Sequence, residues 1–186
     1  MIRLPSLPSL TALCLLAATP MALANSFDSA GGRDKELTFE TTSQLIRQLN
    51  QDFQRCFELE PNYRYDCYDD AYFRGARTVR ENPAYEPVEQ VLREVGEDIQ
   101  SIVARNKDPD LPDIQRGFST FQPIKTEALP MAKARVLESI EEAQTVLLRT
   151  PETGGENFQR IAAALESNKV LLRSALIWIR SVLRIA

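Results

Sequence analysis

The chain has 186 residues, of which 44% are hydrophobic and 26% are charged, and its formal net charge is −4. This length suits one domain with its own core and is short for two, and the mild negative charge argues against wholesale nucleic-acid binding. The sequence contains no histidine, so it lacks the usual general base near neutral pH and a common ligand of transition metals.

Residues 1–24 have the form of a secretory signal peptide. Arg3 supplies a positive start, an apolar run extends from Leu10 to Ala18, and Ala22-Leu23-Ala24 is a small-x-small cleavage signal. The run is shorter than the roughly 20 residues that span a bilayer. We therefore expect cleavage near Ala24 and a periplasmic or secreted protein. Residues 25–40 are expected to form a flexible lead-in, and residues 41–186 a helical bundle domain.

Loss of the leader, which contains Cys14, leaves two cysteines, Cys56 and Cys67. An even pair in an oxidising compartment predicts a disulfide. The midpoint of the two cysteines falls within Glu60-Pro61-Asn62, a turn between two amphipathic segments, so the thiols lie opposite each other in a helical hairpin. A redox pair is favoured less because C-x-x-C spacing is absent. A metal site is also favoured less, because the chain lacks the further nitrogen or sulfur ligands that zinc would need.

Hydrophobic periodicity predicts five helices and no convincing strand. The first is expected to start near Thr41 to Ser43, the second to run from Tyr63 to Arg80, and the third to start near Pro87. The fourth is expected over 126–149 with Pro130 in its first turn, and the last from Asn157 to the C-terminus after a turn at 150–156. The fold class predicted is all-α: a single bundle of about five helices with a disulfide-stapled N-terminal helical hairpin.

The connection from Lys107 to Lys125 is long and contains three prolines and one glycine. Such loops are usually functional or mobile. Phe118, Phe121 and Ile124 predict that its second half packs on the core or on a partner, and packing on the core is favoured. Phe118 and Phe121 are therefore candidate residues of a binding loop.

The last helix carries a narrow basic stripe. On a helical projection Lys169, Arg173, Arg180 and Arg184 fall within about 60° of one another, opposite a broad apolar face that contains Trp178. One interpretation is a buried bundle helix whose stripe faces solvent or acidic neighbours such as those of the third helix. The other is a surface that docks on a membrane or a partner groove. Burial is favoured because leucine-rich helices in bundles are commonly core.

Asp66, Asp69 and Asp70 lie among four tyrosines, an environment that can raise a carboxyl pKa as in enzymes that cleave sugars. The structural interpretation is stronger, because acids in the first turns of a helix stabilise its positive end and no catalytic motif is present. No metal site and no cofactor is expected.

The sequence thus predicts an exported, non-enzymatic helical protein that acts through contacts with another envelope protein. One alternative is a peripheral membrane-surface protein that binds through the basic C-terminal helix. The other is a carboxylate-dependent hydrolase of a cell-envelope polymer. No nucleic-acid partner is expected.

Overall fold

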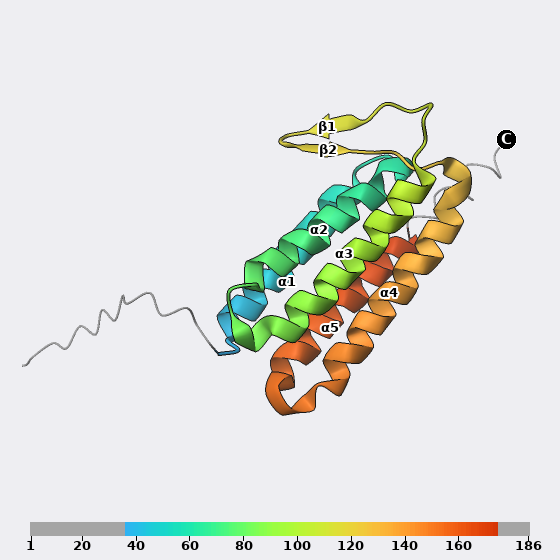
Figure 1. The fold of residues 1–186 in the computed structure, drawn as a ribbon. Coiled ribbons are helices and arrows are strands. Elements are labelled where there is room, and N and C mark those ends of the chain that lie inside the picture. Colours follow the sequence, from blue (N-terminus) through green and yellow to red (C-terminus); the bar gives the residue numbers. More distant parts are fainter. Residues whose placement is uncertain (1–35, 175–186) are drawn as a thin grey trace, which may run out of the picture. The chain divides into compact units, whose positions relative to one another are not determined.

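The computed structural model describes residues 36–174, which form five α-helices and one β-hairpin (Figure 1). The helices are α1 (Phe39–Phe57), α2 (Arg64–Val79), α3 (Glu86–Asn106), α4 (Leu129–Arg149) and α5 (Pro151–Ser174). The strands are β1 (Ile114–Arg116) and β2 (Ser119–Phe121), and three short 3-10 helices are η1 (Pro61–Tyr63), η2 (Pro83–Tyr85) and η3 (Thr126–Ala128). The predicted all-α bundle is confirmed.

Each helix packs against two others, so that the five close a ring around a shared core. The neighbouring pairs are α1 with α2, α2 with α3, α3 with α4, α4 with α5, and α5 with α1. All described elements belong to one compact unit. The side chains at its centre come from every helix and are fully buried, among them Leu45, Leu49, Tyr72, Leu92, Ile99, Ile140 and Ile161.

The Cys56–Cys67 disulfide is present and joins α1 to α2 across η1, with the two Cα atoms 5.5 Å apart. Both cysteines are buried. Beside them the Phe53 ring of α1 stacks on the Tyr68 ring of α2, with centroids 4.7 Å apart. The predicted stapled hairpin is therefore confirmed, and its apolar faces meet as the helical spacing indicated.

Helix α1 begins at Phe39, earlier than the predicted start at Thr41 to Ser43. Thr38 caps the helix, because its hydroxyl oxygen accepts a hydrogen bond from the Thr41 backbone N–H at 3.1 Å. The buried Tyr85 hydroxyl donates to the Thr38 carbonyl oxygen at 2.8 Å, which ties the helix start to η2. The expected lead-in thus ends before Thr38.

Helix α5 begins at Pro151, before the predicted start at Asn157, but its backbone leaves helical geometry at Gly155, where φ is 41° and ψ is −132°. The predicted turn at 150–156 is therefore correct at Thr150, which lies between α4 and α5 with φ −97° and ψ 69°, and at Gly155, whose positive φ favours glycine. Continuation of the last helix to the C-terminus lies outside the described residues.

The hairpin corrects the prediction that the chain has no strand. β1 pairs antiparallel with β2, with Ile114 opposite Phe121 and Arg116 opposite Ser119. Gly117 has a φ of 60° and no other described residue except Gly155 has a positive φ, so Gly117-Phe118 is a two-residue type II′ turn with glycine in its first position. Each strand has three residues. Such short strands show no recognisable alternation of apolar and polar residues in a proline-rich segment.

Candidate binding site at the hairpin

The hairpin lies at the end of the bundle where α3 ends and α4 begins (Figure 1) and is held there by hydrogen bonds to the α1–α2 connection and α2. The Gln122 backbone N–H donates to Asp66 Oδ2 at 2.9 Å. The Tyr63 hydroxyl donates to the Pro112 carbonyl oxygen at 2.8 Å. The Asn62 side-chain amide donates to the Ile124 carbonyl oxygen at 2.7 Å. Both sides of the hairpin are therefore fixed to the same part of the bundle.

The aromatic residues of this segment have opposite environments. Phe121 and Ile124 are buried in the core, which confirms that this part of the segment packs on its own domain. For Phe118 that expectation is wrong, because its side chain is fully exposed. The reason is the turn: Phe118 occupies its second central position, beyond the last strand pair.

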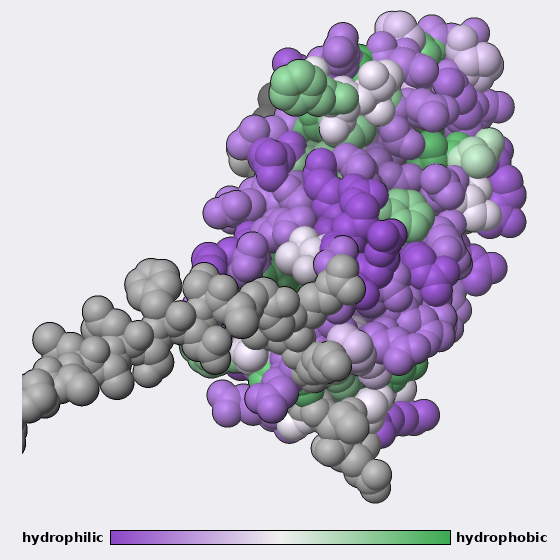
Figure 2. All heavy atoms as spheres, turned by 60° about the vertical axis from the view of Figure 1, so that its left-hand side comes forward, coloured by the Kyte–Doolittle hydropathy of each residue, from purple (hydrophilic) through white to green (hydrophobic). Residues whose placement is uncertain are grey.

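The exposed aromatic side chain contrasts with its surroundings. Figure 2 shows a face of the molecule that is mostly hydrophilic, with separate hydrophobic side chains instead of one continuous apolar patch. Leu111, in the same connection, is also exposed. Phe118 is an exposed apolar group at the tip of an anchored hairpin, and such a group can enter a pocket on another molecule.

One face of the hairpin lies over a cavity. Residues that pair across two strands point to the same face, so Arg116 and Ser119 share a face with Ile114 and Phe121. With α1, α2 and the α1–α2 connection, this face lines a half-open cavity of about 370 Å³. Its lining residues are Arg55, Glu58, Leu59, Cys67, Arg74, Arg116, Ser119 and Phe121.

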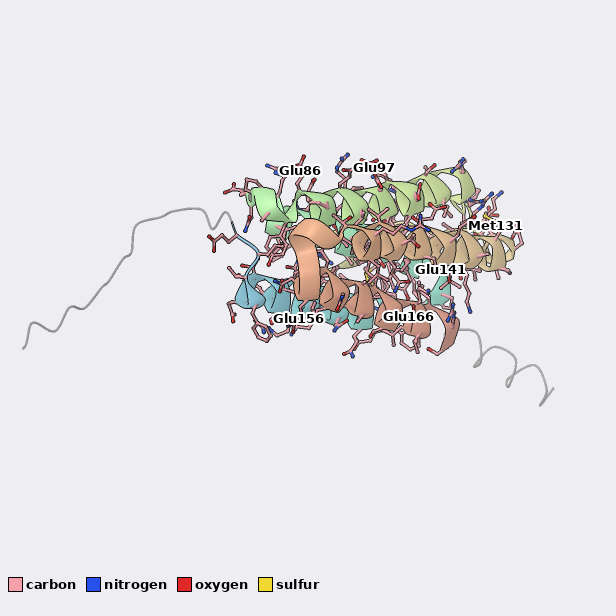
Figure 3. All side chains as sticks on the ribbon, turned by 90° about the horizontal axis from the view of Figure 1, so that it is seen from below. Glu86, Glu97, Met131, Glu141, Glu156 and Glu166 are labelled. Carbon is pink, nitrogen blue, oxygen red and sulfur yellow. A yellow bond between two sulfur atoms is a disulfide. The ribbon has the colours of Figure 1, made fainter. Side chains whose placement is uncertain are left out.

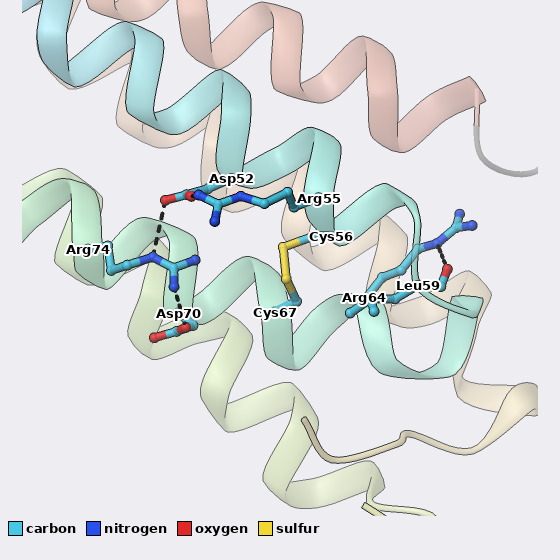
Figure 4. Close-up of a disulfide and its surroundings, with 8 residues drawn as sticks. All are labelled: Asp52, Arg55, Cys56, Leu59, Arg64, Cys67, Asp70 and Arg74. Carbon is cyan, nitrogen blue, oxygen red and sulfur yellow. Dashed lines mark hydrogen bonds and ion pairs between the residues drawn. A yellow bond between two sulfur atoms is a disulfide. The ribbon is translucent and has the colours of Figure 1, made fainter. Parts of the chain in front are cut away.

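Two of the three arginines in this cavity are oriented by one buried carboxylate, Asp52 (Figure 4). Arg74 Nε donates to Asp52 Oδ2 at 3.1 Å, and Arg55 Nη2 pairs with Asp52 Oδ1. Arg74 Nη1 also donates to Asp70 Oδ2 at 2.9 Å. The Asp52 side chain is only 1% exposed, so it lies behind the guanidinium groups and not in the cavity.

The third arginine, Arg116, is exposed, and within the part of the chain that the structure describes its guanidinium has neither a hydrogen-bond nor an ion-pair partner. Sequence reasoning missed all three arginines as site residues. The i,i+3 spacing of Asp52 and Arg55 and the i,i+4 spacing of Asp70 and Arg74 were visible, but they indicate only local pairs. The ion pair between Asp52 and Arg74 joins α1 to α2, so no local spacing in the sequence indicates it.

The three aspartates of α2 have separate structural environments. Asp66 accepts the hydrogen bond that holds the hairpin, and Asp70 pairs with Arg74. Asp69 is 7% exposed, and its burial, together with the charges of Asp66 and Asp70, raises its pKa to about 8. None of the three lines the cavity, and no cluster of three or more potential metal ligands occurs among the described residues.

The described half of the basic stripe is paired with acids. The Lys169 side chain is 7% exposed, and its ammonium group lies 3.0 Å from Glu141 Oε1 and 2.9 Å from Glu166 Oε2. Figure 3 shows these two glutamates on α4 and α5. Arg173 lies 3.4 Å from Glu141. The acidic neighbours therefore belong to α4 and α5 and not to the third helix, while Trp178, Arg180 and Arg184 lie outside the described residues.

A second hollow, of about 520 Å³, lies between α3 and α4. Two pairs of its polar groups contact each other: the Ser139 hydroxyl donates to Asp98 at 2.6 Å, and Arg135 pairs with Glu138 at 2.9 Å. The hairpin cavity has an unpaired guanidinium and is the better candidate for a site.

Comparison with known proteins finds no match among family models, curated proteins or solved structures. In the described range, no helix combines the length and the apolar character that crossing a membrane requires.

Proposed function

We propose that this protein is an exported, non-enzymatic binding protein of the periplasm that acts by contact with another envelope protein, and that the hairpin is its contact element. The observation that carries the proposal is the full exposure of Phe118 at the tip of a hairpin whose base is held by hydrogen bonds on both sides. An aromatic side chain on a rigid support loses little conformational entropy on binding, which favours its use as an anchor.

Two further observations support contact over the alternatives. Catalysis by the α2 aspartates would need carboxylates that reach a substrate, but Asp66 and Asp70 are engaged within the fold and Asp69 is buried. Binding of the basic stripe to anionic lipid would need free basic side chains, but Lys169 is paired with Glu141 and Glu166. A membrane role of this stripe would therefore depend on Arg180 and Arg184.

Site-specific photocrosslinking tests the proposal. Phe118 is replaced by p-benzoylphenylalanine in cells that express the protein, and adducts are resolved after illumination. We expect one discrete adduct, which excess unlabelled wild-type protein suppresses and excess Phe118→Ala protein does not.

The control places the same photoreactive residue at Leu148, an exposed apolar position near the end of α4. No discrete adduct is expected there. The same adducts from both positions, or none from position 118, would count against the hairpin as the contact element.

A further inference from the structure

The cavity beside the disulfide is lined by three arginines, and Phe118 does not line it. Binding through Phe118 therefore leaves these charged groups without a role. We propose that the cavity binds the carboxylate of a glutamate or aspartate within an acidic segment of the protein partner. This inference rests on the proposed function and adds the chemistry of the partner. The partner would carry a pocket that receives Phe118 and, next to it, an acidic side chain that reaches the cavity.

The cavity is organised for a planar anion before any partner binds. A guanidinium group has five N–H donors, and Asp52 and Asp70 together occupy only part of those on Arg55 and Arg74. The Asp52 carboxylate contacts both arginines, so it fixes their relative orientation. The Cys56–Cys67 disulfide joins the two helices that carry them, and Cys67 itself lines the cavity.

The three arginines are matched in number by Asp52, Asp70 and Glu58, so the site has no excess positive charge that would favour a dianion. Asp52 and Asp70 oppose the charges of Arg55 and Arg74, which leaves Arg116 as the guanidinium without a carboxylate partner in the described structure. The remaining acid, Glu58, is exposed and would repel a dianion more strongly than a monoanion. A carboxylate therefore matches the site better than a phosphate.

The other lining groups suit the rest of an acidic side chain. Leu59 and Phe121 are buried apolar residues on the cavity wall, where the methylene groups of a glutamate can pack. The Ser119 hydroxyl adds a polar group on the hairpin side. A volume of about 370 Å³ is near the lower limit for ligand pockets, which suits a side chain in an extended segment and excludes a folded element.

The experiment uses the purified oxidised protein and an octaglutamate peptide, titrated at low salt and followed by the NMR signals of the arginine Nε–H groups. We expect the signals of Arg55, Arg74 and Arg116 to shift, and Arg116→Gln to weaken binding about tenfold, since one charge-assisted hydrogen bond is lost. An octaglutamine peptide is expected not to bind.

Arg105→Gln is the matched control, because Arg105 is exposed and, among residues 36–174, its guanidinium hydrogen-bonds only to Ser101. It is expected to bind octaglutamate as the wild type does. Equal losses from Arg116→Gln and Arg105→Gln, or inorganic phosphate that binds these arginines more tightly than the peptide, would overturn the proposal.

The failure of this inference is distinguishable from failure of the proposed function. Phe118→Ala is expected to retain octaglutamate binding, since Phe118 does not line the cavity. A Phe118 adduct without octaglutamate binding would remove only the carboxylate site. Octaglutamate binding without that adduct would instead remove the hairpin tip as the contact element.

Discussion

Asp52 and Asp69 are both buried acids of the α1–α2 hairpin, but their surroundings differ. Asp52 is contacted by two guanidinium groups, whereas the pKa of Asp69 is raised by burial and by the charges of Asp66 and Asp70 on its own helix. A buried carboxylate is tolerated as an ion when cations compensate for lost hydration, and otherwise it retains its proton.

Replacing Asp52 with Asn is expected to lower the free energy of unfolding by about 2 kcal/mol, because the amide cannot balance Arg55 and Arg74. Urea denaturation followed by circular dichroism measures the change. Glu40→Gln is the control, since its pair with Arg47 is exposed at 3.4 Å and should contribute little. Equal effects of the two substitutions would show that burial of Asp52 has no special role.

Asp69 is expected to make stability fall as pH rises. Its pKa is about 8 in the folded protein and about 3.9 in an unfolded chain. Between these values the folded state retains a proton that the unfolded state has lost, so rising pH favours unfolding by up to about 1.4 kcal/mol per pH unit, and the penalty is complete above about pH 8.

Asp69→Asn removes this titration. The variant should therefore gain stability relative to wild type as the pH is raised from about 5 to about 8, which urea midpoints across this range would reveal. Asp110→Asn, at an exposed loop position, should show no such trend. A difference between Asp69→Asn and wild type that is constant with pH would contradict the raised pKa.

At the scale of single elements, the hairpin depends on one backbone conformation. Gly117 has a φ of 60°, and a Cβ added there would meet no atom within 4 Å. A substitution at this position therefore acts through backbone strain alone, without a steric clash.

Gly117→Val is expected to destabilise the hairpin by about 1–2 kcal/mol, since a β-branched residue disfavours positive φ. Amide hydrogen exchange should become faster at 114–121 while exchange in α1 to α4 stays unchanged. Gln115→Val, on the outer face of β1, is the control and should leave hairpin exchange slow. Unaltered protection in Gly117→Val would mean that the tertiary anchors alone hold the segment.

The disulfide stabilises the α1–α2 hairpin as an element. Its cysteines are separated by 11 positions in the chain, and closing so short a loop is expected to contribute about 2–3 kcal/mol on the chain-entropy model. The double variant Cys56→Ala, Cys67→Ala should lose this amount in urea denaturation. Reductant should destabilise the wild type to a similar extent and leave the double variant unaffected. If reductant left the urea midpoint of the wild type unchanged, the disulfide would not be stabilising.

For the whole molecule, export remains a prediction from the leader. Protein recovered from the periplasm should begin at Asn25 by intact-mass measurement, with a mass that reflects a closed disulfide. Replacing Ala24 with a bulky residue such as Phe should block cleavage, because the cleavage site needs small side chains. Unprocessed chain with two alkylatable thiols at 56 and 67 would contradict the prediction.

The elements with regular local patterns were predictable. α3 carries Val88, Leu92, Val95 and Ile99 on one face, and all four are buried. The hairpin strands were not predicted because three residues carry no periodicity, although Arg116-Gly117-Phe118-Ser119 contains the glycine that a type II′ turn needs. Of the site, Phe118 and Phe121 were identified, but their opposite exposure was not, since it depends on the hairpin, which places Phe118 in the turn and Phe121 on a strand that packs on the bundle.

The sequence by itself determined the helical bundle and the position of its disulfide, because both follow from periodicity and symmetric spacing along a short stretch of chain. Only the tertiary structure decided that Asp52 reaches Arg74, that Arg116 from the hairpin lines the same cavity as Arg74, and that Glu141 of α4 pairs with Lys169 of α5. These contacts link residues on different elements, and their existence depends on how the helices pack and not on any local pattern.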